Sequence, residues 1–229
     1  MVLLYSETLF YLYRNLGNAT GAVYLLLFLY SLFNYGYFKN GFRYIFWLFL
    51  VYAFFENVQY ITTGLHLRND YFFNHFYFFF GALFQGLIYF HFIRNGVVKT
   101  IIKFIVPTLL VAIIITGLYG DNYLRLPILL PVRNALFLLF YFQLHKELIQ
   151  ESKPGQLRKN PLFWFNLGVL FMSVYILIFS ILFDYVVQVS DNWAFIMGIM
   201  GNFLDYVSLV LWFIAVWKLR KWQIKPTGV

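Results

Sequence analysis

Three ionisable side chains, Glu56, Arg133 and Asp205, lie inside long apolar runs of the sequence. A charge at such a position in a bilayer costs about 2.5 to 3.5 kcal/mol on insertion scales, so these residues generally pair with one another or mark a site for ions or ligands. Counted inward from the outer ends of their runs at about 1.5 Å per residue, Glu56 lies on the order of 12 Å deep, Arg133 roughly 10 Å and Asp205 about 18 Å. The matched depths of Glu56 and Arg133 predict an ion pair. Asp205, deeper and with no obvious cationic partner, is the stronger functional candidate.

Further polar residues lie at the same level. On a helix, residues three and four apart share a face. Tyr60 therefore shares a face with Glu56, and Asn202 shares a face with Asp205 and Tyr206. Together they predict a polar cup in the outer half of the membrane, closed below mainly by Phe, Leu and Ile. The alternative is that they make only interhelical hydrogen bonds, with Glu56 and Arg133 a purely structural pair. The candidate ligand-binding residues are Glu56, Tyr60, His75, Arg133, Asn134, Asn202, Asp205 and Tyr206.

The surrounding composition defines the class of protein. The chain has 229 residues, of which 62% are hydrophobic and 11% charged. This leaves too few polar side chains to cover a soluble globule, so an integral membrane protein is expected. The predicted fold is all-α, a single domain over 1–229 that crosses the bilayer with seven helices.

Each predicted span contains the roughly 20 apolar residues that a helix needs to cross the hydrocarbon core. The first span lacks ionisable groups and is expected to be peripheral. Residues 1–19 are predicted to be an amphipathic lead-in, 146–160 a cytoplasmic loop and 218–229 a basic cytoplasmic tail. The spans are 20–38, 44–64, 71–93, 100–119, 126–145, 161–184 and 193–217.

The basic residues predict the orientation, because Lys and Arg accumulate in cytoplasmic connections. When the connections are assigned to alternate sides, one side has only Arg14, Arg68 and Arg125. The N-terminus is therefore expected outside and the C-terminus in the cytoplasm. The other side collects Lys39, Arg43, Arg94, Lys99, Lys103, Lys146, Lys153, Arg158, Lys159, Lys218, Arg220, Lys221 and Lys225.

Several chemistries lack the residues they require. There is no cysteine, and so no thiolate nucleophile or thiolate metal site. The last span has no lysine at its middle, which excludes a retinal Schiff base. His66 and His75 lie near the outer surface whereas His91 and His145 lie near the inner one, so three histidines cannot meet on one metal. No cofactor, metal or catalytic residue is expected.

The expected partner is the lipid bilayer. The formal charge of +8 is explained by the cytoplasmic connections, so no nucleic-acid partner is expected. The basic inner face could contact a membrane or cytoplasmic protein. The oligomeric state is not predicted.

One segment carries a family resemblance. The sequence Glu56-Asn57, followed by 69–77 with Asn69, Asp70, Asn74 and His75, resembles a pattern in small seven-span membrane proteins of Bacteroidota. This resemblance implies a bacterial inner membrane and no particular activity. The layout is also similar to the seven-helix sensor modules of bacterial signalling proteins, without their kinase or cyclase output domain.

Two functions remain open from the sequence. The first is a non-enzymatic receptor-like or accessory protein whose outward cup binds a small ligand or a membrane partner. The second is a small transporter or channel in which Glu56, Arg133 and Asp205 contact substrate or a coupling proton. Transport requires a polar path to the cytoplasm, and the inner half supplies little beyond Asn34, Gln85 and Asn166. This favours the receptor-like function, with a membrane enzyme third.

Overall fold

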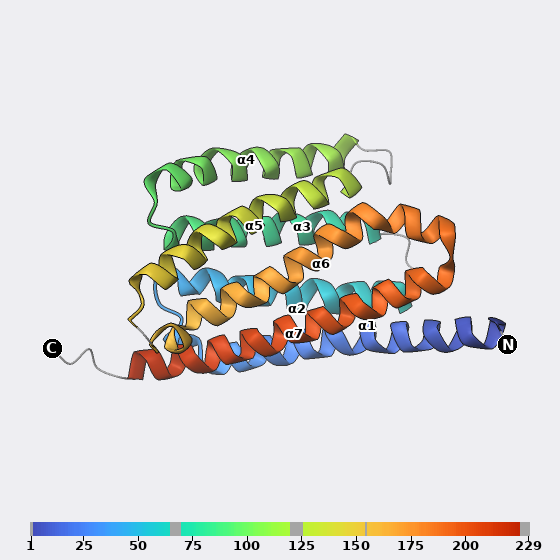
Figure 1. Ribbon diagram of the computed structural model, residues 1–229, viewed down its shortest axis with the longest axis horizontal. Helices are drawn as coiled ribbons and strands as arrows, with labels where there is room; N and C mark the ends of the chain where they lie inside the picture. Colours follow the sequence, from blue (N-terminus) through green and yellow to red (C-terminus); the bar gives the residue numbers. More distant parts are fainter. Residues whose placement is uncertain (1, 65–69, 120–125, 154, 225–229) are drawn as a thin grey trace.

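The computed structural model describes residues 2–64, 70–119, 126–153 and 155–224 (Figure 1). Within these ranges the secondary structure is entirely helical, which confirms the all-α class. Two short 3-10 helices, η1 and η2, lie in connections at Tyr35–Tyr37 and Leu157–Lys159. The seven α-helices are α1 Val2–Phe33, α2 Phe42–Gly64, α3 Asp70–Phe92, α4 Gly96–Tyr119, α5 Leu126–Glu151, α6 Pro161–Val189 and α7 Asp191–Ile224.

Local capping fixes two of the helix starts. The Asn160 side chain accepts a hydrogen bond from the Leu162 amide at 2.9 Å and Pro161 occupies the first turn of α6, an arrangement that satisfies one of the free amides there. The Asn95 side chain accepts from the Val97 and Val98 amides at 3.0 and 3.1 Å before α4. Both helices therefore begin close to the predicted start of their apolar run.

Several helices extend beyond the predicted boundaries, among them α6, which runs to Val189. α1 is continuous from Val2 to Phe33, so 1–19 is not a separate lead-in, and the helix ends before the predicted residue 38, where Asn34 and Gly36 follow. α5 runs to Glu151 and α7 to Ile224, into the predicted loop and tail. The reason is that Lys, Glu, Arg and Gln are good helix formers, so a helix can continue after its apolar run ends.

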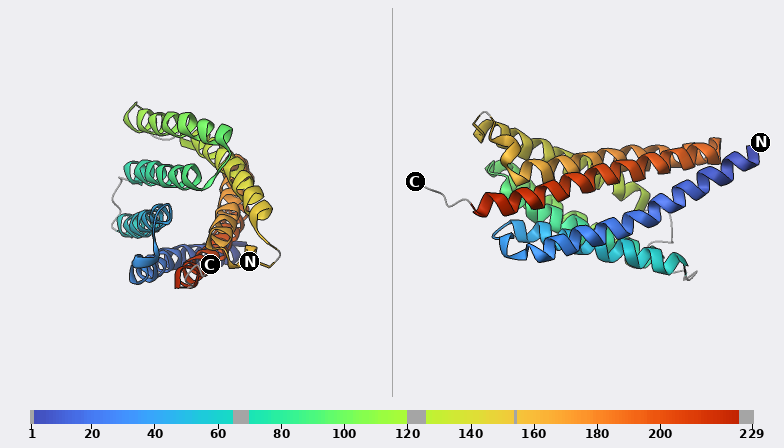
Figure 2. Two further views of the ribbon diagram at one scale, coloured as in Figure 1. Left: turned by 90° about the vertical axis from the view of Figure 1, so that its left-hand side faces the viewer. Right: turned by 90° about the horizontal axis from the view of Figure 1, so that it is seen from below.

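The seven helices form a ring. Each packs against its neighbours in chain order, and α1 packs against α7 to close the ring, while α3 also contacts α5. Seen end-on, α1 to α4 form one row and α5 to α7 lie along the other side (Figure 2, left). The connections around 34–41, 93–95 and 155–160 share one end of the bundle with the C-terminal end of α7 (Figure 1, left). These are the segments in which the basic residues gather, and this end is called the basic end below.

The outside of the bundle is apolar. Large hydrophobic side chains project from it, with exposed fractions from 36% for Phe171 to 86% for Phe33. Monomeric soluble proteins rarely expose apolar surface so extensively. Within the described residues, four helices are long and apolar enough to cross a membrane, over Thr8–Phe33, Gly96–Leu118, Pro161–Leu182 and Asn192–Trp222. By length and composition the chain is a multi-pass membrane protein.

Candidate functional site

Two carboxylates from different helices lie near each other in the half of the bundle away from the basic end. Glu56 on α2 and Asp205 on α7 are close enough for their charges to interact, and both side chains are half-buried. In the described part of the chain the one ion pair joins Arg94 to Glu151 at 2.7 Å. Neither Glu56 nor Asp205 therefore has a cationic partner there, although like charges destabilise each other in a medium of low dielectric constant.

Tyrosines from the other helices surround this pair. The Tyr77 hydroxyl on α3 is placed to donate a hydrogen bond to the Glu56 carboxylate. Tyr24 on α1 is 1% exposed and lies within electrostatic range of both carboxylates. Tyr175 on α6 lies within electrostatic range of Asp205. We call Glu56, Asp205, Tyr24, Tyr77 and Tyr175 the acidic cluster.

A layer of fully buried aromatic rings lies beneath the acidic cluster, toward the basic end. Trp212, two turns beyond Asp205 on α7, stacks on Tyr52 at 5.7 Å and on Phe165 at 6.0 Å between ring centroids. Its indole nitrogen donates to the Phe165 carbonyl at 3.1 Å. Phe49 also packs on Trp212, and none of these four residues is more than 2% exposed. We call Phe49, Tyr52, Phe165 and Trp212 the aromatic floor.

Arg133 lies apart from both carboxylates. It is 4% exposed on α5, with its guanidinium 5.0 Å from the centre of the Phe78 ring on α3. One of its nitrogens donates to the Asn134 side chain at a long 3.4 Å, and its Nε has no hydrogen-bond partner. Its charge acts on Tyr52 and Tyr77, not on a carboxylate.

The predicted ion pair between Glu56 and Arg133 is therefore wrong. The two residues do lie toward the same end of the bundle, as their depths indicated. However, α2 packs on α1 and α3, whereas α5 packs on α4, α6 and α3. Because α3 lies between the two helices, matched depth does not bring the side chains together.

Asn202 and Tyr206 were predicted to line the cup, but both are engaged with α1. The Tyr206 hydroxyl donates to the Leu16 carbonyl at 2.8 Å, and the Asn202 amide donates to the Tyr13 carbonyl at 3.3 Å. Their observed role is to attach α7 to α1, the interhelical hydrogen bonding left open as the alternative.

The other candidate residues do not lie in the acidic cluster. Asn134 is 2% exposed and its amide donates to the Leu130 carbonyl of its own helix at 2.8 Å. His75 is buried at a separate pocket between α3 and α4. The side chain of Tyr60 lies outside the described part of the structure. Of the eight candidates, the structure brings Glu56 and Asp205 together.

Sequence analysis missed the tyrosines. Tyr24 lies on the helix that was expected to be peripheral, and Tyr52 and Tyr77 lie in runs rich in Phe and Tyr. Tyr24, Tyr52 and Tyr77 lie within about one helical turn of the depth of Glu56, and this was the one feature of the sequence that could have indicated them. With 19 tyrosines in the chain, that signal could not select these three.

No metal site accompanies the acidic cluster. Within the described ranges, no group of three or more His, Cys, Asp or Glu side chains is arranged to hold a metal ion. The acidic cluster offers two carboxylates, tyrosine hydroxyls and aromatic rings, which are the groups that recognise a cation or exchange a proton.

Fold and site together define a multi-pass, all-α membrane protein with an internal pair of carboxylates. Comparison of the chain with protein-family models, curated proteins and solved structures found no match. The function must therefore be argued from the residues of this chain.

Proposed function

We propose that the chain is a non-enzymatic, receptor-like membrane protein whose acidic cluster binds a small organic cation from the outer side of a bacterial inner membrane. In this proposal all seven helices cross the bilayer, with the N-terminus outside. The shortest of them, α2 and α3, have 23 residues, or about 35 Å at 1.5 Å per residue, enough to span a hydrocarbon core of about 30 Å. The basic end then faces the cytoplasm, where Lys and Arg accumulate.

The observation that carries the proposal is that Glu56 and Asp205 lie within electrostatic range of each other without a cationic partner among the described residues. Two carboxylates near each other in an apolar surrounding are stable when a proton or a bound cation offsets their charge. The rings of Tyr24 and Tyr77 lie within electrostatic range of both carboxylates, and an aromatic ring attracts an alkylammonium group by about 0.5 to 2 kcal/mol. An ammonium ligand would satisfy both features at once.

The exposure of the side chains supports access from the outer side. Both carboxylates are half-buried, whereas the residues of the aromatic floor below them are not exposed. This asymmetry is expected for a site that is open on one side only.

The aromatic floor also favours a receptor over a transporter. A substrate passing to the cytoplasm would have to displace Trp212, which is packed against three aromatic rings and hydrogen-bonded to a backbone carbonyl. Beyond it, the Tyr89 hydroxyl donates to Asn166, whose amide donates to the Tyr141 carbonyl, joining α3, α6 and α5. Binding without passage is therefore the function that the geometry supports best.

The test uses tetramethylammonium as the probe and tert-butanol as a neutral molecule of similar shape, titrated calorimetrically into the purified protein in nanodiscs. We expect tetramethylammonium to bind and tert-butanol not to bind. Glu56→Gln and Asp205→Asn should each weaken binding by about tenfold or more, the usual cost of removing one partner of a buried charge pair. Glu151→Gln, an acidic residue at the basic end, is the matched control and should bind like the wild type.

Two results would contradict the proposal. One is equal binding of the two probes, which would mean that charge is not recognised. The other is unchanged binding in both carboxylate variants. Uptake of tetramethylammonium into proteoliposomes at a rate that depends on Asp205 would instead favour the transporter.

A further inference from the structure

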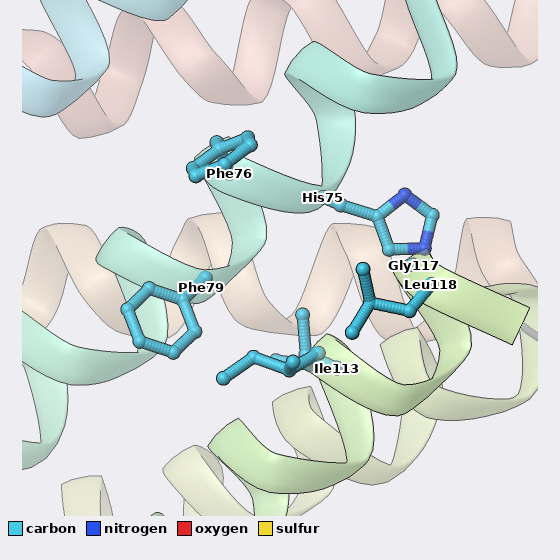
Figure 3. A pocket seen from close by; sticks show the side chains of 7 residues that line it. His75, Phe76, Phe79, Ile113, Gly117 and Leu118 are labelled. Atoms are coloured by element: carbon cyan, nitrogen blue, oxygen red, sulfur yellow. The ribbon is translucent and has the colours of Figure 1, made fainter.

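A groove separate from the acidic cluster opens between α3 and α4. It has a volume of about 200 Å³ and an almost entirely apolar lining. Phe76, Ile114 and Leu118 are exposed at its rim, so the groove faces the surroundings of the bundle and not its interior. Figure 3 shows its side chains, with the His75 ring beside Gly117. The lining residues are His75, Phe76, Phe79, Ile113, Ile114, Gly117 and Leu118.

The absence of a side chain at Gly117 keeps the groove open. A Cβ atom there would lie 3.1 Å from the His75 ring. A larger side chain at this position would project into the space between α3 and α4. Gly117 is therefore the position at which the groove can be filled without touching any charged residue.

A second, much smaller cavity shares one lining residue, Ile113, with the groove. Its volume is about 10 Å³, close to the space that one water-sized atom group occupies. Phe78, Leu129 and Leu130 form its apolar walls, and the remaining wall is Arg133. The buried guanidinium thus borders a small space at the inner side of an apolar groove.

Arg133 lacks the partners that a buried guanidinium requires. A guanidinium has five N–H donors, yet in the described part of the chain Arg133 contacts the Phe78 ring and makes one 3.4 Å hydrogen bond to Asn134. No carboxylate there lies within ion-pair distance, and its Nε is buried without an acceptor. Burying an unpaired cation is unfavourable by several kcal/mol, so an anion brought by a ligand would be strongly stabilised.

We propose that the α3–α4 groove and Arg133 together bind a single-chain amphiphile with a carboxylate head, a long-chain fatty carboxylate. The alkyl chain lies in the groove, and the carboxylate reaches past Ile113 to the guanidinium. A planar carboxylate matches the fork of N–H donors on arginine and needs little space. The phosphate head of a phospholipid is larger than a carboxylate, and the cavity beside Arg133 is small. This site is independent of the acidic cluster.

The test compares three ligands with the same kind of tail in nanodiscs of zwitterionic lipid: oleate, oleyl alcohol and oleoyl lysophosphatidic acid. Native mass spectrometry gives the occupancy of each. We expect oleate to bind about tenfold or more tightly than oleyl alcohol, the difference that a buried charge-assisted pair supplies. Equal occupancy by oleate and the alcohol, or tighter binding of the phosphate ligand, would overturn the proposal.

Variants separate the head from the tail. Arg133→Met should abolish the preference for oleate and leave binding of oleyl alcohol unchanged, which also reports that the variant is folded. Gly117→Leu should weaken both ligands. Arg220→Met, at an exposed cation of the basic end, should change neither. Oleate binding that survives both Arg133→Met and Gly117→Leu would overturn the proposal. If Arg133→Met does not fold, the proposal is still tested by Gly117→Leu and by the comparison of the three ligands.

Discussion

At the scale of single residues, the charges inside this bundle belong to two separate surroundings. Glu56 and Asp205 interact with each other and with tyrosines, whereas Arg133 rests on Phe78 and borders the α3–α4 groove. Tyr52 and Tyr77 lie within electrostatic reach of both. These two tyrosines are therefore neighbours that the two surroundings share.

A double-mutant cycle tests this separation. Glu56 and Arg133 form no ion pair but act on the same tyrosines, so the effects of Glu56→Gln and Arg133→Met on the free energy of unfolding should add to within about 1 kcal/mol. The measurement is chemical unfolding of the two single variants and the double variant in detergent. An interaction energy of about 2 kcal/mol or more, typical of a buried ion pair that is broken on one side, would show that the two residues are paired after all.

The sequence predicted which single residues are unusual, but not which of them are neighbours. The positions of Glu56, Arg133 and Asp205 within apolar runs identified the residues that needed a physical explanation, and depth along each helix was a usable coordinate. Depth does not report which way a helix is rotated or which helix stands beside it. For that reason the ion pair of Glu56 and Arg133 was wrong, and the position of Tyr24 next to the carboxylates was not foreseen.

At the scale of elements, one side chain joins three helices at the basic end. Glu147 on α5 accepts hydrogen bonds from the Arg94 and Asn95 amides at 2.6 and 3.1 Å, between α3 and α4, and from the Gln143 side chain at 2.7 Å. Partial burial acts to raise the pKa of Glu147, but these hydrogen bonds and the charge of Arg94 outweigh it, so the pKa lies below its ordinary value. The ionised carboxylate is therefore the form that the fold stabilises.

The stability of the protein should depend on pH through this group. Because the folded-state pKa of Glu147 is lowered, its contribution is complete above the ordinary glutamate pKa of about 4.3 and is lost as the pH falls through the lower folded value. Glu147→Gln should cost about 1 kcal/mol near pH 7, the value of a typical hydrogen bond to the lost acceptor. The gap between wild type and variant in thermal unfolding should close in acid, and a gap that stays constant would contradict this assignment.

Helices were easier to predict than their ends. The start of α6 is encoded by Asn160 and Pro161, and six helices begin within a few residues of a predicted span. The ends of α5 and α7 lie beyond the spans because the charged residues that leave an apolar run still favour helix. Hydropathy reports where a membrane could be, while helix propensity and capping decide where a helix stops.

At the scale of the whole molecule, the ring has two different ends. The basic connections gather at one end, and the acidic cluster lies nearer the other, separated by the aromatic floor. The proposed orientation places the basic end in the cytoplasm and gives the carboxylates access to the outside. This arrangement agrees with the alternation of the connections between the two ends of the bundle and with the concentration of Lys and Arg at one end. It also agrees with the position of the aromatic floor between that end and the acidic cluster.

The most direct test of this arrangement is the accessibility of a cysteine at position 205. The chain has no cysteine of its own, so Asp205→Cys introduces a single thiol next to Glu56. Membrane-impermeant cationic and anionic methanethiosulfonates would be applied to vesicles of each orientation. Trp193→Cys, at the exposed start of α7, and Ser152→Cys, in the connection after α5, serve as controls for the outer and the cytoplasmic side.

An outward-open site that recognises cations predicts that Asp205→Cys reacts from the outer side, faster with the cationic reagent than with the anionic one, because Glu56 remains beside the thiol. It also predicts no reaction from the cytoplasmic side, where the aromatic floor blocks the path. Reaction from the cytoplasmic side, or equal rates with both reagents from outside, would contradict the central claim that this protein holds a cation site open to the exterior.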